Sequence, residues 1–133
     1  MSSHILVTAA IIEKARKYLI TQRLKNAKYF PDLWEFPGGK LEPGENPRVC
    51  LEREIFEELG IEIKAGDIFG RTSYTHNENT HIELEGFYCD YISGKIQHLE
   101  VQDHKWAYPN EMKSYDFCPA DLVFIEKLIG RIY

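Results

Sequence analysis

Two strand-like segments open the chain, with a charged turn between them. Residues 4–12 (HILVTAAII) are mostly apolar, and residues 17–22 (KYLITQ) combine β-branched, aromatic and polar side chains. Short runs of this kind, bounded by charged or turn-forming residues, are typical of β-strands. The segment EKAR between them is therefore predicted to be the turn of a strand pair.

A long loop and a short strand follow this pair. Residues 24–33 are predicted to be a loop, and residues 34–36 (WEF) a short strand. The sequence Pro-Gly-Gly comes next and is expected to end that strand, because proline and glycine interrupt regular structure. Residues 41–46 (LEPGEN) form a second predicted loop.

The segment after the second loop carries helix signals at both ends. Asn46 suits the N-cap, where a side-chain oxygen accepts hydrogen bonds from the free backbone N–H groups of the first turn. Pro47 suits the first helical position, and Gly60 suits the residue just past the end. A helix is therefore predicted from Pro47 to Leu59.

The remainder of the chain is predicted to hold further strands and one more helix. Strand-like segments cover residues 67–75 and 81–92, on either side of the polar segment THNENT, and residues 106–108 form another short strand. Apolar residues recur at helical spacing within residues 119–131, which predicts a closing helix. Strands interleaved with two helices predict an α/β fold with a mixed sheet.

Size and composition are those of an ordinary globular protein. The 133 residues suffice for one domain with one core, so a single domain over residues 1–133 is expected. No apolar run approaches the roughly 20 residues that cross a bilayer, and the first eight residues lack the pattern of a secretion signal. Three cysteines far apart fit a reducing compartment. We expect a cytoplasmic monomer or homodimer without a membrane partner.

The charge balance narrows the class of ligand. The formal net charge of -5 argues against a nucleic-acid polymer as the partner, because such binding usually needs a basic surface. A small phosphorylated substrate remains compatible with this charge, since a bound divalent cation can supply positive charge.

Three glutamates share one face of the predicted helix. Glu54, Glu57 and Glu58 stand at positions i, i+3 and i+4, within an arc of about 100°. An apolar stripe that begins at Leu51 lies beside this arc, so the carboxylates are expected near the buried edge, where they need compensating positive charge. Such ligands suit Mg²⁺ or Mn²⁺. Taken alone, the cluster is more typical of a solvated acidic surface with Arg53 as its ion-pair partner.

The residues around the glutamates match a longer motif. The segment GKLEPGENPRVCLEREIFEELGI fits the Nudix box, G-x5-E-x7-R-E-U-x-E-E-x-G-U with U a bulky aliphatic residue, at each fixed position. These positions are Gly39, Glu45, Arg53, Glu54, Ile55, Glu57, Glu58, Gly60 and Ile61. The chain thus resembles the Nudix hydrolases, and LWEFPGGK resembles their MutT-like branch. The resemblance implies the Nudix fold, a mixed β-sheet sandwiched between helices (α/β/α).

The resemblance also implies roles for the box residues. Glu54, Glu57 and Glu58 would be the principal ligands of Mg²⁺, or of Mn²⁺, joined by a backbone carbonyl at Gly39 or its neighbour. Arg53 would orient the glutamates through an ion pair. MutT-like enzymes direct water at the β-phosphorus of a nucleoside triphosphate, which gives the monophosphate and pyrophosphate.

Three further candidate residues lie outside the box. Glu100, in HLEVQDHKW, has an offset from Trp106 that resembles a catalytic loop glutamate of MutT relatives, with a role as general base and metal ligand; otherwise it is an ordinary loop charge. Arg23 resembles a family position that contacts substrate. Lys40 could meet a phosphate. For both of these, a solvated surface position is the alternative.

Base selection is expected near the closing helix. The segment FCPAD resembles a MutT pattern in which Pro-Ala precedes an asparagine that reads oxidised guanine, but here the position holds Asp121. Pro-Ala-Asp looks more like the bacterial CTP pyrophosphohydrolases. A carboxylate can accept from the cytosine amine, or equally from guanine N1–H and its amine. Alternatively, Asp121 only caps the helix. Four aromatic residues are candidates for stacking on a base: Tyr29, Phe30, Trp34 and Tyr74.

The leading functional hypothesis is a Mg²⁺-dependent (d)NTP pyrophosphohydrolase that acts on CTP, dCTP or modified pyrimidine nucleotides. An 8-oxo-dGTP diphosphatase is the nearest rival. A non-catalytic nucleotide-sensing Nudix domain is a rival of another class, although every box glutamate is present. The histidines show no zinc-like spacing, and no role is predicted for His76, His81, His98 and His104.

Overall fold

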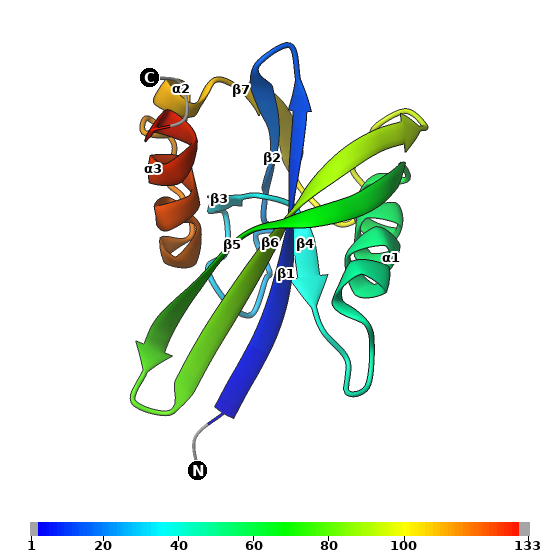
Figure 1. Cartoon of the computed structure of the whole chain (residues 1–133). Coiled ribbons are helices and arrows are strands. Elements are labelled where there is room, and N and C mark those ends of the chain that lie inside the picture. Colours follow the sequence, from blue (N-terminus) through cyan, green and yellow to red (C-terminus); the bar gives the residue numbers. More distant parts are fainter. Residues whose placement is uncertain (1–2, 131–133) are drawn as a thin grey trace.

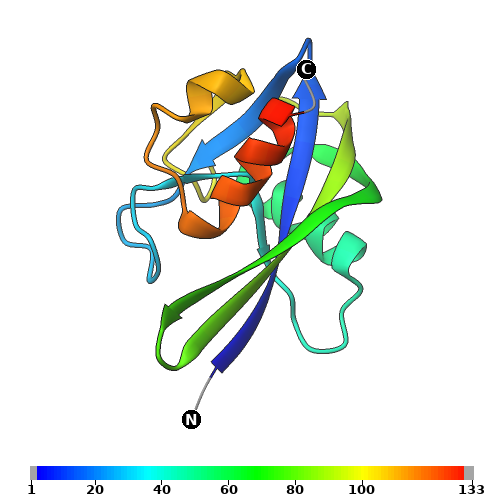
Figure 2. The same ribbon diagram turned by 60° about the vertical axis from the view of Figure 1, so that its left-hand side comes forward.

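The computed structural model describes residues 3–130. It contains a mixed β-sheet of seven strands with helices on both faces (Figures 1 and 2). The strands are β1 (Ser3–Lys14), β2 (Lys17–Gln22), β3 (Trp34–Glu35), β4 (Gly38–Lys40), β5 (Glu62–Asn77), β6 (Thr80–Ser93) and β7 (Asp103–Ala107). The helices are α1 (Pro47–Leu59), α2 (Pro109–Met112) and α3 (Leu122–Gly130), with a 3₁₀ turn η1 (Pro119–Asp121) before α3.

Strand β1 is the centre of the sheet. On one edge it runs parallel to β6, from the pair Ser3–Thr80 onwards. On its other edge its two halves have different partners: Val7 pairs with Lys40 of β4, whereas the end of β1 pairs with β2 in a hairpin. Between these pairings, the N–H of Ala10 donates to the carbonyl of Pro37 at 2.7 Å. The edge of β1 is therefore shared between two strands that diverge from it.

Alternating side chains of β1 supply the two cores. Ala9 and Ile11 belong to the cluster that includes α3, and Ala10 and Ile12 belong to the cluster that includes α1. Figure 2 shows α3 in front of the sheet and α1 behind it. This arrangement follows from the period of two along a strand, which sends successive apolar side chains to opposite faces. The predicted mixed sheet between helices is confirmed.

Helix α1 has the predicted bounds. The Asn46 side-chain oxygen accepts hydrogen bonds from the N–H groups of Arg48 and Val49 at 2.9 and 3.3 Å. Gly60 has a φ of 69° in the left-handed region, and its N–H donates to the Phe56 carbonyl. Both ends of the helix are thus closed by the residues that the sequence indicated.

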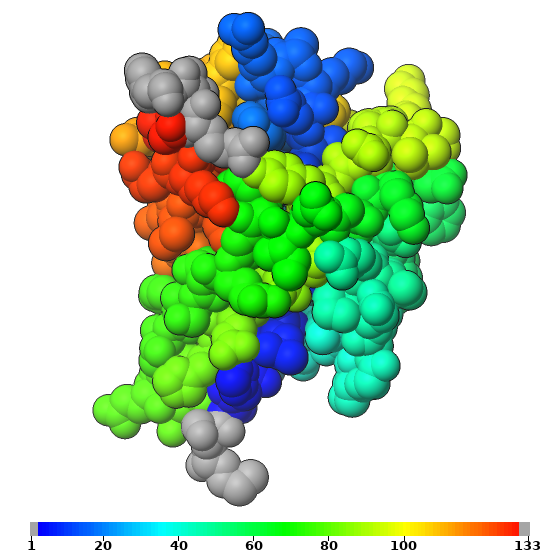
Figure 3. Space-filling model, in the orientation of Figure 1, coloured from blue at the N-terminus to red at the C-terminus, as the bar shows by residue number. Residues whose placement is uncertain are grey.

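Other elements differ from the sequence expectation. The residues Gly38–Lys40, expected to end a strand, form β4, because backbone pairing with β1 outweighs the poor strand propensity of glycine. Strands β5 and β6 extend beyond the predicted 67–75 and 81–92. Their hairpin projects past α1 and α3 (Figure 3). Strand β7 begins three residues before the predicted 106–108 and includes two of those three residues. The short helix α2 was not predicted.

The predicted closing helix begins with the η1 turn, and residue 131 lies outside the described residues. None of the helices within residues 3–130 is long and apolar enough to cross a membrane.

Candidate active site

A cluster of carboxylates lies where α1 faces β4 and the loop between β6 and β7. Glu58 is only 8% exposed. Burial raises the pKa of its side chain well above the ordinary value, and the nearby charges of Glu35, Glu54 and Glu100 raise it further. Burial also raises the pKa of Glu54, whose carboxyl lies within hydrogen-bonding reach of Glu58. The protein's own groups therefore leave this cluster short of positive charge.

Arg53 binds three carboxylates at the outer side of the cluster. Its Nε and Nη2 donate to the two carboxylate oxygens of Glu45 at 3.0 and 3.1 Å. Its Nη1 donates to Glu54 at 3.2 Å and to Glu57 at 2.7 Å. The hydrogen bonds from Arg53 and from the backbone N–H of Glu42 lower the pKa of Glu45. One guanidinium thus fixes the loop glutamate and two helix glutamates relative to one another.

Gly39 lies against the side chain of Glu54. A Cβ atom at this position would overlap the carboxyl group of Glu54, so a larger residue would force that side chain or the backbone of β4 to move. The Gly39 carbonyl accepts a hydrogen bond from Thr8 Oγ1 at 3.1 Å.

Glu100 reaches the same place from the loop between β6 and β7. The N–H groups of Leu99 and Glu100 donate to the backbone carbonyl of Glu58 at 3.0 and 3.2 Å. Glu100 and Glu58 line one cleft together with Gly39 and Arg23. The structure therefore brings Glu100 to the box glutamates, 42 residues after Glu58 in the sequence.

The donor set of this cleft fits a hard divalent cation. It offers carboxylate oxygens and a backbone carbonyl, the ligands that Mg²⁺ and Mn²⁺ prefer. The raised pKa values of Glu54 and Glu58 indicate that ionised carboxylates here need a cation.

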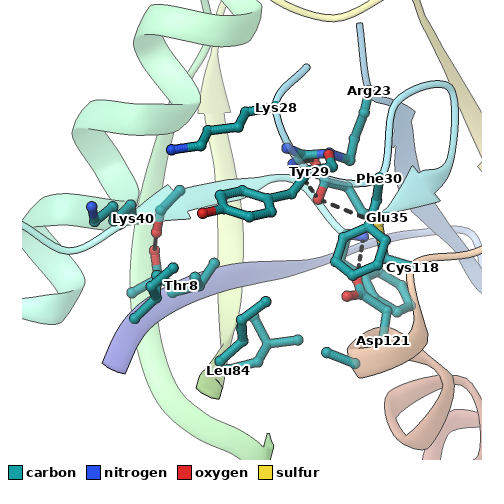
Figure 4. Close-up of a pocket in the computed structure, with 17 residues that line it drawn as sticks. Thr8, Arg23, Lys28, Tyr29, Phe30, Glu35, Lys40, Leu84, Cys118 and Asp121 are labelled. Carbon is teal, nitrogen blue, oxygen red and sulfur yellow. Dashed lines mark hydrogen bonds and ion pairs between the residues drawn. The ribbon is translucent and has the colours of Figure 1, made fainter. Parts of the chain in front are cut away.

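A cavity of about 330 Å³ adjoins the cleft and shares Arg23, Glu35, Gly38 and Gly39 with it. In Figure 4, Lys28 and Lys40 lie at the end nearer α1, and Asp121 lies at the opposite end beside α3. The shared residues therefore place the cleft at Glu58 and Glu100 next to the cavity that ends at Asp121. Arg23, Lys40 and Asp121, the three substrate-contact candidates from the sequence, all line it.

Asp121 is 4% exposed and forms the floor of the far end of the cavity. Its Oδ2 accepts a hydrogen bond from the backbone N–H of Phe36 at 2.8 Å. Burial, followed by the charge of Glu35, raises the pKa of Asp121 well above the ordinary value. The Asp121 side chain therefore does not cap α3. Its hydrogen bond comes from Phe36, in the segment after β3, and not from the start of α3.

Arg23 is held by the protein within the cavity wall. Its Nη1 pairs with Glu35 Oε1 at 3.1 Å, and its Nε donates to the carbonyl of Tyr29 at 2.9 Å. Glu35, whose side chain is 17% exposed, was not singled out from the sequence. Its position in LWEFPGGK, three residues before the first glycine of β4, was the available signal. The pair connects β2, β3 and the loop over residues 24–33.

The aromatic candidates separate into two groups. Tyr29 and Phe30 line the cavity, and Tyr29 extends across it in Figure 4. Trp34 is 8% exposed and packs on Tyr115, with ring centroids 5.1 Å apart. Tyr74 packs against Phe30 from outside the cavity lining, at 5.9 Å. Only Tyr29 and Phe30 of the four are thus placed to meet a ligand there.

Residues 3–128 match the family model of the NUDIX domain. The chain belongs to the Nudix family. It is a Nudix hydrolase, because curated relatives over nearly its whole length are named as pyrophosphohydrolases or diphosphatases. The resemblance found in the sequence is confirmed.

Two curated relatives are similar to this Nudix hydrolase over most of their length. A CTP pyrophosphohydrolase of Escherichia coli is 38% identical over 124 residues, which is 93% of this chain and 90% of the relative. An 8-oxo-dGTP diphosphatase of Buchnera aphidicola is 35% identical over 128 residues, or 96% and 95% of the two chains.

Solved structures agree with this assignment. The solution structure of the Escherichia coli ORF135 protein has a TM-score of 0.84 and 36% identity, over 97% of this chain and 91% of that one. The crystal structure of a MutT protein from Methanosarcina mazei has a TM-score of 0.85 at 23% identity, over 98% and 96% of the two chains, and shows the shared fold.

Proposed function

We propose that this Nudix hydrolase is a Mg²⁺-dependent pyrophosphohydrolase that converts a nucleoside triphosphate and water into the monophosphate and pyrophosphate. We propose CTP, dCTP or a modified pyrimidine nucleotide as its substrate. The observation that carries the proposal is the pair of adjoining hollows, a cleft lined by Glu58 and Glu100 and a cavity lined by the buried carboxyl of Asp121. The cavity volume of about 330 Å³ falls in the usual range for small-molecule sites.

The two ends of the cavity suit the two ends of a nucleotide. Lys28 and Lys40 lie at the end of the cavity nearer α1, the helix that carries the glutamates, and supply positive charge for a phosphate chain. Tyr29 and Phe30 offer aromatic surface to a base, and Asp121 lies beyond them. The phosphates therefore lie over Gly39 and α1, and the base lies against η1.

In this proposal Glu54, Glu57 and Glu58 hold Mg²⁺ together with the Gly39 carbonyl. Bound Mg²⁺ would neutralise phosphate charge and lower the pKa of water. Arg53 keeps the glutamates in position. Glu100 is the general base, because its exposed side chain stands on the wall of the cleft.

Hydrolysis forms one phosphorus–oxygen bond and breaks another. The water oxygen bonds to the β-phosphorus, and one water proton passes to the carboxylate of Glu100. The bond between the β-phosphorus and its bridging oxygen breaks, and that oxygen leaves with the α-phosphate. The products are a nucleoside monophosphate and pyrophosphate.

Burial at Asp121 supports a preference for cytosine. Burial and the charge of Glu35 raise the pKa of Asp121 and favour its neutral form. Burial also raises the pKa of Glu35, but there the ion pair with Arg23 opposes the shift. A neutral carboxyl both donates and accepts. Cytosine presents an acceptor at N3 beside its donor amine, which matches this pair. The relative named CTP pyrophosphohydrolase is consistent with that match.

An 8-oxo-dGTP diphosphatase is the second candidate. An ionised Asp121 would offer two acceptors, which match guanine N1–H and its amine, and the Buchnera aphidicola relative bears that name. Rates of pyrophosphate release from CTP, dCTP, GTP, 8-oxo-dGTP and ADP-ribose, compared at equal Mg²⁺, test the proposal. We expect the highest kcat/KM for CTP or dCTP. Release of orthophosphate alone, or turnover of ADP-ribose only, would contradict it.

A further inference from the structure

Two histidines and an aspartate meet beside the loop that carries Glu100. His98 belongs to the loop between β6 and β7, and Asp103 and His104 open β7. Nε2 of His98 lies 2.8 Å from Nδ1 of His104 and 3.9 Å from Oδ1 of Asp103. The three ligand atoms all lie within 4.8 Å of one another. No role was predicted for these histidines, because their spacing matches no zinc motif.

These distances fit one zinc ion. Tetrahedral Zn²⁺ with bonds of about 2.0–2.1 Å separates its ligand atoms by about 3.3 Å, between the two distances that the structure shows. Two imidazoles and one carboxylate suit Zn²⁺ better than Mg²⁺, which prefers oxygen ligands only. Small side-chain rotations would equalise the spacing. A fourth position would remain for water.

Two further features of the group formed by His98, Asp103 and His104 favour the binding of an ion. The backbone N–H of His104 donates to Asp103 Oδ1 at 2.8 Å, which orients the carboxylate. The side chains of His98 and Asp103 are 39% and 47% exposed, so an ion can enter from solvent. The hydrogen bond between the rings is no obstacle, because the donor ring can carry its proton on the other nitrogen when both rings are neutral.

We propose that His98, Asp103 and His104 form a Zn²⁺ site separate from the carboxylate cluster. Zinc bound there would join the loop to the start of β7 and close the segment from residue 98 to residue 104 around Glu100. Insofar as Glu100 serves the proposed function, zinc would restrict the loop that positions it. The binding itself does not depend on that function.

The test is calorimetric titration of Zn²⁺ into the tag-free protein with excess Mg²⁺ present to fill the carboxylate cluster. We expect one equivalent to bind the wild type. The variant His98→Gln/His104→Gln should bind zinc at least about tenfold more weakly, by analogy with the loss of metal-supporting groups. Asp103→Asn, which keeps the shape of the side chain, should also weaken binding. Circular dichroism would verify that each variant is folded.

Two controls make the outcome decisive. His4→Gln/His81→Gln removes an equal number of imidazoles from β1 and β6, where these residues pair in register, and should bind zinc like the wild type. Glu58→Gln should lose turnover and keep the zinc site, which separates this proposal from the proposed function. Unchanged zinc affinity in His98→Gln/His104→Gln, or loss of binding only in the His4/His81 variant, would overturn the proposal.

Discussion

The Asp121 carboxyl accepts a hydrogen bond from the Phe36 N–H at 2.8 Å, across 85 residues of sequence. The bond attaches η1 to the segment that leads into β4, and so places a nearly inaccessible acid at one end of the cavity. Because one oxygen is used by Phe36, the remaining hydrogen-bonding capacity of Asp121 is fixed in direction.

Substitution of Asp121 tests whether it reads the base. The Asn side chain carries an acceptor and a donor, as the neutral carboxyl does, so Asp121→Asn should keep kcat/KM for CTP within about tenfold. Asp121→Ala loses the contact with the base and should lower kcat/KM for CTP by about 10- to 100-fold, the equivalent of 1–3 kcal/mol. Steady-state kinetics with CTP and GTP would measure both. An Ala variant with wild-type selectivity would contradict the assignment.

Glu58→Gln tests the charge imbalance in the cluster. The folded protein holds a proton on Glu58 that the unfolded chain releases, so metal-free stability falls as pH rises from the ordinary value of 4.5 to the raised pKa. The Gln variant does not lose stability in this way, because the glutamine side chain does not ionise. At pH 8 without metal its Tm should exceed that of the wild type by roughly 2–6 °C, which corresponds to about 1 kcal/mol. Differential scanning calorimetry at pH 5 and pH 8 would show whether the difference grows with pH.

Metal affinity should rise over the pH range in which metal-free stability falls. The ion needs ionised Glu58, so the Mg²⁺ concentration for half-maximal activity should decrease as pH rises above 4.5. Mg²⁺ should also raise the Tm of the wild type more than that of Glu58→Gln. An equal rise in Tm for both proteins would show that Glu58 is not a ligand.

Gly39→Ala should displace a proposed ligand without changing any charge. The added methyl overlaps the Glu54 carboxyl, so either that side chain or β4 must move. We expect kcat to fall by about 100-fold, as for small misplacements in other active sites. Gly44→Ser, in the loop before α1, is a spatial control because open space surrounds Gly44, although its φ of 79° adds local backbone strain. Full activity in Gly39→Ala would mean that Glu54 can move freely.

Arg53→Lys tests the positioning of the glutamates by one guanidinium. A lysine ammonium cannot reproduce the bonds to Glu45, Glu54 and Glu57 together. Activity at limiting Mg²⁺ should fall by about 10- to 100-fold, with partial recovery at high Mg²⁺. Arg48→Lys is the matched control, since Arg48 lies on the same helix and donates to the Gly66 carbonyl. Equal losses in both variants would indicate a general effect on α1.

Glu100→Gln tests the general base. Loss of a positioned base costs about 10²- to 10⁴-fold in kcat, and Mg²⁺ affinity should change far less. Glu78→Gln, at the exposed turn between β5 and β6, is the control. Pre-steady-state and steady-state kinetics would separate chemistry from product release. A kcat within a factor of two of the wild type would assign the proton transfer to another group.

The sequence predicted best what local signals determine. The bounds of α1 follow from Asn46, Pro47 and Gly60, all within or next to the helix. The Nudix box likewise occupies one continuous segment. Strand β4 was missed because its partner β1 lies 30 residues earlier, and GGK has no strand propensity of its own. Pairing across the sheet decides that element.

Contacts between distant segments could not be predicted from the sequence for the same reason. Nothing local to Asp121 indicates that Phe36 N–H is its partner, and nothing local to Glu35 indicates its ion pair with Arg23. The meeting of His98 with His104 depends on where the loop joins β7. Such relationships are set by the packing of the whole chain.

Phe36 contacts Asp121, and Gly39, three positions later, contacts Glu54. The intervening backbone is held beside β1 by the Pro37 hydrogen bond and by the pairing of Gly38 and Gly39 with Ala9 and Thr8. Three extended residues span about 10 Å. This stretch therefore fixes the distance between the end of the site that would recognise a base and the end that would break an anhydride. A ligand whose scissile bond lies nearer to its base, or farther away, would present the wrong atom to the glutamates.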